Sequence, residues 1–188
     1  MFFRKRRTSQ SEPFPLAMIG ARMGERVLQV GVDDPAVAGM VAAKVGLSGQ
    51  TAFVVTTEAD AERARQAAAD ASADADVRVA STRSFPFESG SFDLAVVHDT
   101  RGFLASLAPE DRVGCLQETH RVLRRGGRVV VMDAAPRGGL AGLLRPYHEN
   151  EHYRAGGGAE GALRAEGFAP VRVLAEREGY KFTEGLRS

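Results

Sequence analysis

The chain has 188 residues, of which 44% are apolar and 26% are charged, and these proportions suit one globular domain with a full-sized core. Its net charge of +1 gives no global electrostatic case for nucleic acid as a partner. The single cysteine, Cys115, excludes a disulfide within the chain and favours a reducing compartment. Neither a signal peptide nor a long apolar run is present, so we expect a cytoplasmic protein without stable membrane insertion.

The start of the chain differs in composition from the rest. Residues 1–15 are basic and polar and are interrupted by Pro13 and Pro15. We therefore interpret residues 1–15 as a tail and residues 16–188 as a single domain.

Residues 26–45 are predicted to form a buried strand, a tight turn and a helix. The apolar residues Val27, Leu28 and Val30 are typical of the middle of a parallel sheet, and Gly31 ends the strand where the backbone turns. Asp34 suits a helix N-cap and Pro35 suits the first helical position. A strand that leads through a glycine into a helix is the usual seat of a nucleotide-like ligand.

The chain continues this alternation of strands and helices. Further strands are predicted over residues 51–57, 77–80, 92–97 and 128–132, and further helices over residues 61–71, 109–123 and 159–166. Asp60 is expected to cap the helix at 61, while Gly126 and Gly127 are expected to end the helix before the fifth strand. Such alternation predicts a doubly wound α/β fold, a parallel sheet with helices on both faces.

The last part of the chain interrupts the alternation. Residues 136–158 are rich in glycine and proline and are interpreted as an irregular insertion. Residues 171–177 and 180–186 are predicted to form an antiparallel hairpin that closes one edge of the sheet.

A zinc-peptidase pattern falls inside the insertion. His148, Glu149 and His152 satisfy His-Glu-x-x-His, in which two histidines bind zinc and the glutamate acts as general base. Pro146 comes directly before the pattern, and the residues between the histidines are polar where a buried helix needs apolar ones. Zinc hydrolysis is therefore kept only as a remote alternative, and no metal site is predicted.

Three stretches carry a resemblance to a known family: Arg-Val-Leu-Gln-Val-Gly at 26–31, Phe-Pro-Phe-Glu-Ser-Gly-Ser-Phe-Asp at 85–93, and Gln-Glu-Thr-His-Arg-Val-Leu-Arg-Arg-Gly-Gly at 117–127. Their order and spacing resemble the class I S-adenosylmethionine-dependent methyltransferases, particularly the small-molecule branch of ubiquinone and menaquinone methyltransferases. The resemblance implies a Rossmann-like, mostly parallel sheet of seven strands with an antiparallel last strand. It also implies that the cofactor S-adenosylmethionine lies across the carboxyl ends of the first four strands.

The glycine-rich turn departs from the family pattern. The family's first strand usually ends in an acidic residue where this chain has Gln29, and only Gly31 remains of the family's glycines. The Asp33 side chain would lie near the amino acid part of the cofactor, where its charge opposes a carboxylate and favours an ammonium. Asp33 and Asp34 equally suit plain turn and capping residues.

The ends of the next strands supply the other candidate site residues. Glu58 matches the family's acid that accepts hydrogen bonds from the ribose hydroxyls, although it also suits a solvated acid at a helix start. Ser81 and Thr82 stand where the family often has an aspartate that reads the adenine amine. His98 and Asp99 end the fourth strand, where they could orient a substrate or accept its proton, or form a polar pair without chemistry.

The function implied by the resemblance is methyl transfer from S-adenosylmethionine to a small-molecule substrate, with a homodimer left open. One alternative is a methyltransferase fold that has lost or changed its cofactor and serves as a binding module. A nicotinamide-dependent oxidoreductase is disfavoured, because it needs glycines and bare amides around a pyrophosphate where this chain has two aspartates.

Overall fold

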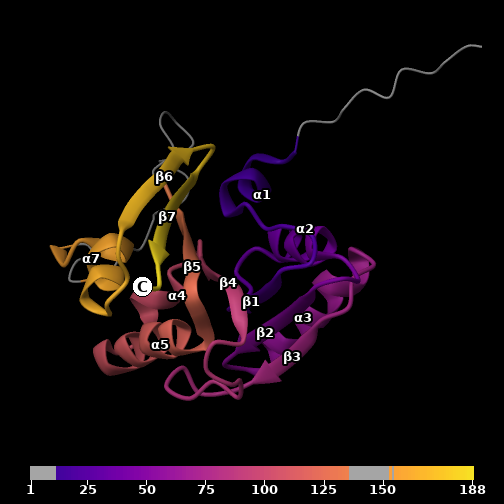
Figure 1. Ribbon diagram of the computed structural model, residues 1–188, viewed down its shortest axis with the longest axis horizontal. Coiled ribbons are helices and arrows are strands. Elements are labelled where there is room, and N and C mark those ends of the chain that lie inside the picture. The colour runs from indigo at the N-terminus through magenta and orange to yellow at the C-terminus, as the bar shows by residue number, and fades with distance from the viewer. Residues whose placement is uncertain (1–11, 136–152, 154) are drawn as a thin grey trace, which may run out of the picture.

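A computed structural model describes residues 12–135, 153 and 155–188 (Figure 1). The helices are α1 (Phe14–Ile19), α2 (Pro35–Val45), α3 (Glu58–Asp70), α4 (Phe103–Ser106), α5 (Pro109–Val122) and α7 (Gly158–Ala165). The strands are β1 (Arg26–Val30), β2 (Gln50–Val55), β3 (Asp76–Val79), β4 (Phe92–Asp99), β5 (Leu123–Ala134), β6 (Val171–Arg177) and β7 (Tyr180–Leu186).

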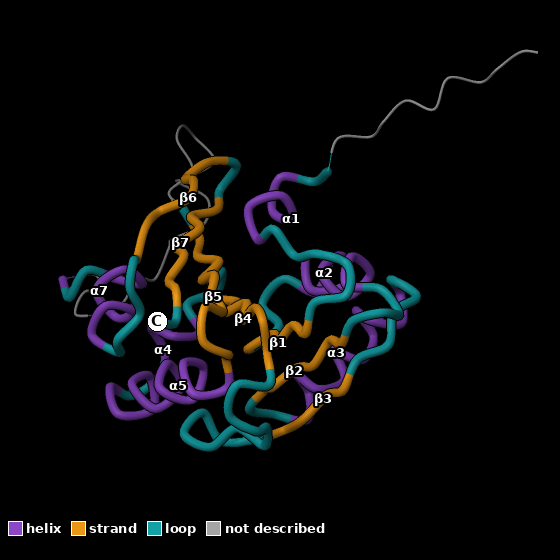
Figure 2. The backbone as a smooth tube through the Cα atoms, viewed as in Figure 1, coloured by secondary structure: helices purple, strands orange, loops and turns teal. Residues whose placement is uncertain are grey.

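The strands form one seven-stranded sheet in the order β3-β2-β1-β4-β5-β7-β6, drawn in orange in Figure 2. The first five strands of this order are parallel, whereas β7 runs antiparallel to both β5 and β6. The strand order reverses between β1 and β4, because the chain moves outward from β1 to β3 and then returns to β4. The predicted fold class and the terminal hairpin are both confirmed.

Apolar side chains on both faces of the sheet explain why the central strands are continuously hydrophobic. On β1, Leu28 and Val30 pack in a core cluster with residues of α4 and α5, whereas Val27 packs in a second cluster with α1 and α2. On β2, Phe53 packs against α3 in a third cluster. Helices α1, α2 and α3 therefore cover one face, and α4, α5 and α7 cover the other (Figure 1).

Helix α3 begins earlier than the sequence predicted. Thr57 is its N-cap, and the Thr57 Oγ1 accepts a hydrogen bond from the Asp60 backbone N–H at 3.1 Å. The Thr57 hydroxyl also donates to the Asp60 carboxylate at 2.6 Å. The prediction that Asp60 caps the helix is wrong, because a cap needs a backbone donor two or three residues onward and Thr57 has it.

The boundary between α5 and β5 also differs from the prediction. Helix α5 ends at Val122, and β5 begins at Leu123, so Gly126 and Gly127 lie within the strand. The register of β4 against β5 shifts between Phe92 and Leu94, which marks an irregularity in the ladder. Gly126 has a φ of +70°, so the glycines serve this irregularity of the strand rather than the helix end.

Helix α1 is attached to the sheet by a distant arginine. Arg128 of β5 donates hydrogen bonds of 2.7 Å to the carbonyl oxygens of both Ile19 and Gly20 at the end of α1. At the other end of this helix, the ring of Phe14 packs edge-on against Phe182 of β7, with 5.7 Å between the centroids. The first described helix therefore covers the central strands from one side.

Candidate functional site

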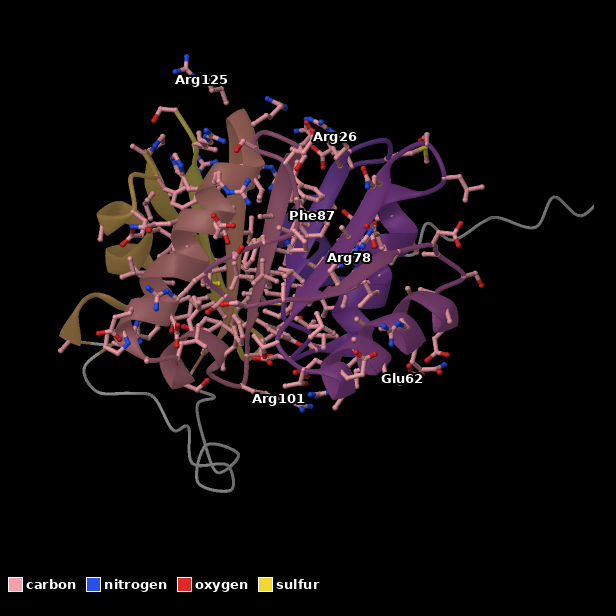
Figure 3. The ribbon with its side chains drawn as sticks, turned by 90° about the horizontal axis from the view of Figure 1, so that it is seen from below. Arg26, Glu62, Arg78, Phe87, Arg101 and Arg125 are labelled. Atoms are coloured by element: carbon pink, nitrogen blue, oxygen red, sulfur yellow. The ribbon has the colours of Figure 1, made fainter. Side chains whose placement is uncertain are left out.

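The carboxyl ends of β1, β2 and β4 meet at one edge of the sheet, where the strand order reverses. Figure 3 shows this edge at the end marked by Arg101 and Glu62, opposite the end marked by Arg26 and Arg125. Ligands of open α/β sheets bind in the crevice outside the carboxyl ends of the strands at such a reversal. This edge is therefore the candidate functional site.

The turn after β1 is shaped by Gly31 and Asp34. Gly31 has a φ of +75°, and a Cβ added there would lie 3.5 Å from the His98 carbonyl oxygen and 3.8 Å from Cγ of Phe103. Asp34 is the N-cap of α2, as predicted, since its Oδ1 accepts a hydrogen bond from the Val37 N–H at 3.2 Å. Its Oδ2 accepts a hydrogen bond from the Tyr180 hydroxyl at 2.9 Å, so both carboxylate oxygens of Asp34 serve the fold.

Asp33 connects the two loops that border the site. Its Oδ2 accepts a hydrogen bond of 2.8 Å from the backbone N–H of Arg101, which follows β4. Burial raises the pKa of the Asp33 carboxyl, although the Arg101 N–H acts in the opposite direction. No local pattern in the sequence indicated the contacts of Arg101 and Phe103 with this turn, because these residues lie some 70 positions away from it.

Gln29 and His98 form a buried pair beneath the turn. Both side chains are fully buried, and the His98 Nε2 lies 2.8 Å from the Gln29 Oε1. The Gln29 amide in turn donates to the Ala38 carbonyl oxygen of α2 at 3.0 Å. Burial lowers the pKa of His98 to about 4, so the imidazole is neutral at neutral pH. The pair thereby ties the ends of β1 and β4 to the helix that follows the turn.

Asp99 lies on the other face of the sheet from His98, because consecutive residues of a strand point to opposite faces. Its Oδ1 accepts a hydrogen bond of 2.7 Å from the Leu104 N–H in α4. Burial, reinforced by the neighbouring carboxylate of Asp133, raises the pKa of Asp99 to about 8. Asp133 is the register partner of Asp99 on β5. Its position just after the predicted fifth strand is the sequence feature that could have indicated a carboxylate at this edge of the sheet. The two residues predicted as a catalytic pair are thus divided between the faces.

Glu58, Ser81 and Thr82 follow the ends of β2 and β3. Glu58 opens α3 with a side chain that is 73% exposed and that pairs with Arg65 at 2.8 Å. The Ser81 hydroxyl accepts a hydrogen bond of 3.2 Å from the Arg83 N–H, whereas Thr82 is buried. The structure therefore brings the residues predicted for the ribose and the adenine to the same edge as Gly31 and Asp33.

Two absences hold for the part of the chain that the structure describes. Within residues 12–135, 153 and 155–188, no group of three His, Cys, Asp or Glu side chains is arranged to hold a metal ion. His148, Glu149 and His152 lie outside the described residues. No helix in the described part of the chain combines the length and the apolar character that a membrane span needs.

The comparison with protein families gives one match, to the model of the methyltransferase domain over residues 28–131, which is more than half of the chain. The chain belongs to the methyltransferase domain family. The match begins within β1, covers β2, β3 and β4 and ends within β5, so it includes every predicted cofactor residue of this methyltransferase domain. A comparison with curated protein sequences gives no match.

Solved structures agree with this assignment at the level of the fold. A SAM-dependent methyltransferase from Aquifex aeolicus is 17% identical, with a TM-score of 0.70 over 92% of this chain and 87% of that one. The PH0226 protein from Pyrococcus horikoshii is also 17% identical, with a TM-score of 0.64 over 93% and 87% of the two chains. An arsenic(III) S-adenosylmethionine methyltransferase from Chlamydomonas reinhardtii is 23% identical, with a TM-score of 0.61 over 89% and 65%.

S-adenosylmethionine is the cofactor of this methyltransferase family, and the side chains at the edge of the sheet fit its chemistry. The molecule carries an ammonium and two ribose hydroxyls, which donate hydrogen bonds to oxygen atoms, and a cationic sulfur, which is attracted to negatively charged oxygen atoms. Asp33, Asp99 and Glu58 supply carboxyl groups at the ends of β1, β4 and β2. The fit is weakest at the cofactor's own carboxylate, which Asp33 repels.

Proposed function

We propose that this methyltransferase domain transfers the methyl group of S-adenosylmethionine to a small molecule, as in the ubiquinone-like branch of the family. The observation that carries the proposal is the set of oxygen acceptors at the strand-order reversal. Asp33, Glu58 and Asp99 follow or end three neighbouring parallel strands, where the fold binds its ligands.

Each acceptor has a role in the proposed complex. Glu58 accepts hydrogen bonds from the ribose hydroxyls, which its exposed carboxylate can reach after release from Arg65. Ser81 and Thr82 contact the adenine, and Asp33 faces the ammonium. Gly31, backed by the buried Gln29 and His98, allows the cofactor to approach the backbone.

The chemistry requires positioning more than strong acids or bases. When bound, S-adenosylmethionine supplies a methyl group on a cationic sulfur that departs as a neutral thioether. A substrate hydroxyl or amine that receives the methyl group loses its proton as the new bond to carbon forms, and the Asp99 carboxylate takes that proton. A pKa of about 8 keeps much of Asp99 protonated at neutral pH. The cationic sulfur of a bound cofactor would lower this pKa and so favour the carboxylate form that can take the proton.

The test begins with calorimetric titration of S-adenosylmethionine and S-adenosylhomocysteine into the wild-type protein. Glu58→Ala should weaken both ligands roughly tenfold or more, because a hydrogen bond to a charged group contributes about 1.5–3 kcal/mol. Glu62→Ala is the matched control: Glu62 is equally exposed at 73% and also pairs with Arg65, at 3.3 Å, but it lies one turn into the helix. The Glu62→Ala protein should bind both ligands with the affinity of the wild type.

Two results would contradict the proposal. Absence of binding by either ligand at millimolar concentration would remove the enzyme hypothesis and leave a binding module on a methyltransferase fold. Equal affinity of Glu58→Ala and the wild type would remove the ribose assignment. For the substrate class, transfer of a labelled methyl group to small metabolites rather than to protein or nucleic acid is the expected result.

A further inference from the structure

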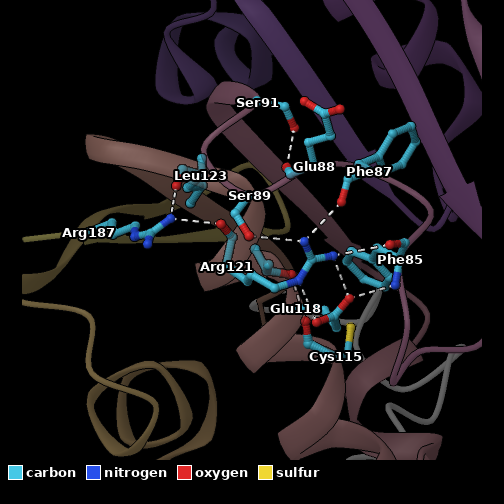
Figure 4. A network of polar contacts seen from close by, with 11 residues as sticks. Phe85, Phe87, Glu88, Ser89, Ser91, Cys115, Glu118, Arg121, Leu123 and Arg187 are labelled. Atoms are coloured by element: carbon cyan, nitrogen blue, oxygen red, sulfur yellow. Dashed lines mark hydrogen bonds and ion pairs between the residues drawn. The ribbon is translucent and has the colours of Figure 1, made fainter.

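The second and third family-like stretches of the sequence contact each other in the fold (Figure 4). Arg121 of α5 donates hydrogen bonds to two carbonyl oxygens of the loop between β3 and β4, that of Phe87 at 2.9 Å and that of Phe85 at 3.1 Å. Glu118 of the same helix accepts a hydrogen bond of 2.6 Å from the Phe85 N–H. The helix therefore binds the main chain of this loop in both directions.

An ion pair holds the Arg121 guanidinium in place. Its Nε and Nη2 lie 2.8 Å from the two oxygens of Glu118, which is a two-point contact between planar groups. The Arg121 guanidinium and the Phe85 N–H lower the pKa of Glu118, so this carboxylate is charged at neutral pH. With its orientation fixed, the guanidinium loses little further conformational freedom when it binds the loop.

One turn earlier on α5, Gly114 holds the loop by close packing. A Cβ added to Gly114 would lie 2.6 Å from Cγ and 3.2 Å from Cβ of Arg83. Gly114, Glu118 and Arg121 are spaced at i, i+4 and i+7, which places them on one face of the helix. This face, named here the loop-holding stripe, contacts the loop at Arg83, Phe85 and Phe87.

The held segment begins next to Ser81 and Thr82, the residues assigned to the adenine. We infer that the loop-holding stripe acts as a positioning device for Ser81 and Thr82, so that Glu118 and Arg121 raise cofactor affinity and adenine selectivity without touching the cofactor. The inference rests on the proposed function. Its physical basis is preorganisation, since a loop fixed before binding need not be ordered by the ligand.

The test compares Arg121→Lys with Arg124→Lys. Lysine at 121 keeps the charge beside Glu118 but lacks the planar fork that reaches both carbonyl oxygens. Arg124 lies two residues beyond α5, and its side chain pairs with Asp93 of β4 at 2.6 Å instead of with the loop carbonyl oxygens, so its substitution controls for the loss of an arginine. Calorimetry measures the Kd of S-adenosylhomocysteine and of S-inosylhomocysteine, which lacks the adenine amine.

The expected result for Arg121→Lys is about a tenfold higher Kd for S-adenosylhomocysteine and a reduced preference over S-inosylhomocysteine, with faster hydrogen exchange over residues 81–91. Arg124→Lys should match the wild type in all three. Lower thermal stability with unchanged Kd and unchanged preference would overturn the inference, since that is the behaviour of a purely structural contact.

Glu118→Gln is the second variant, in case Arg121→Lys does not fold. It keeps an acceptor for the Phe85 N–H but loses the ion pair that orients Arg121. We expect the Kd of S-adenosylhomocysteine to rise and the preference over S-inosylhomocysteine to fall, both by less than in Arg121→Lys. An unchanged preference would count against the inference. If the wild type binds neither ligand, the proposed function itself fails, which is distinct from binding that Arg121→Lys leaves unaltered.

Discussion

Asp33 is a carboxylate for which the protein and the proposed cofactor compete. In the structure its Oδ2 is bonded to the Arg101 N–H, and most of the side chain is buried. An ammonium that approaches this carboxylate gains Coulomb energy in a partly dehydrated site, whereas a carboxylate is repelled. The sign of the net effect can be measured with substitutions that remove the charge or the whole side chain.

We predict that Asp33→Asn weakens S-adenosylmethionine about tenfold, because the amide keeps the shape but loses the charge that faces the ammonium. Adenosine, which lacks the ammonium, should bind equally to both proteins, and calorimetry with the two ligands checks this. Tighter binding of S-adenosylmethionine by Asp33→Gly would contradict the assignment and show that the side chain only fills the space.

Asp99 makes the stability of the fold depend on pH. Its folded pKa of about 8 exceeds the ordinary value of 3.8, so the folded state holds a proton that the unfolded state releases. Stability is then greatest below the unfolded pKa and falls as the pH rises from about 4 to about 8. The groups that face Asp99 include the carboxylates of Asp133 and Asp33, which strengthen the effect, and Arg112, which weakens it.

We predict that Asp99→Asn raises Tm at pH 9 by about 5 °C or more and by clearly less at pH 5, where only the first part of the fall between pH 4 and pH 8 has occurred. The amide oxygen can still accept the Leu104 N–H, while the buried charge is gone. Thermal melts followed by circular dichroism at the two pH values measure the difference, with the exposed Asp74→Asn as control. Equal shifts at pH 5 and pH 9 would show that the carboxyl does not titrate as described.

At the scale of elements, the contact between α2 and α3 depends on a single missing side chain. A Cβ added to Gly39 would lie 2.5 Å from the Ala67 carbonyl oxygen and 3.3 Å from the Ala71 Cβ. Glycine to alanine inside a helix usually gains about 1 kcal/mol. We predict that Gly39→Ala instead lowers the free energy of unfolding by about 1–3 kcal/mol, because the helices must separate. Urea denaturation measures it, and any gain in stability would refute the close contact.

The elements that the sequence predicted well are those with local signals. Asp34 followed by Pro35 predicted the start of α2, and the runs of apolar residues predicted the central strands. The start of α3 was misplaced because Thr57 and Asp60 are both residue types that cap helices well. Strand β2 ends at Val55, two residues before Thr57, so the helix can begin directly after Thr57. The end of α5 was predicted to within one residue, but the start of β5 lies at Leu123 instead of residue 128, because Gly126 and Gly127 belong to a β4–β5 irregularity that arises from pairing.

The site was predictable as a set of strand ends but not as a set of partners. Alternation and resemblance located Glu58, Asp33 and Asp99 near the carboxyl edge. They could not assign the Arg101 N–H to Asp33 or the Gln29 amide to His98, because these contacts join segments some 70 residues apart. Burial, which moves the pKa of His98 to about 4, likewise depends on packing that no local pattern contains.

At the scale of the whole molecule, Arg128 joins the first described helix to the centre of the sheet. Its side chain is only 19% exposed, it bonds two carbonyl oxygens at the end of α1, and it lies 4.0 Å from Glu25 and 3.9 Å from Glu184. Burial lowers its pKa, while the two glutamates oppose that change. The arginine thus satisfies carbonyl groups that a helix end leaves open.

We predict that Arg128→Met releases α1, because methionine fills the volume but cannot bond the carbonyl oxygens of Ile19 and Gly20. Hydrogen exchange over residues 14–20 should rise at least tenfold, and the free energy of unfolding should fall by about 2–4 kcal/mol. Arg124→Met, at a more exposed ion pair, should leave exchange in α1 unchanged. Unaltered protection of α1 in Arg128→Met would mean that its apolar face alone holds the helix.

The loop-holding stripe on α5 has a consequence for how the protein tolerates change. Its polar contacts at Phe85 and Phe87 are made to backbone atoms: two carbonyl oxygens, which every residue type supplies, and one N–H, which every type except proline supplies. Exposed side chains of this loop, such as those of Ser84 and Glu88, can therefore be replaced while the path of the chain is kept, whereas the buried Phe85 belongs to the core. A family built on this plan can alter what its loop recognises through a few substitutions, with the helix and the loop backbone retained as a fixed frame.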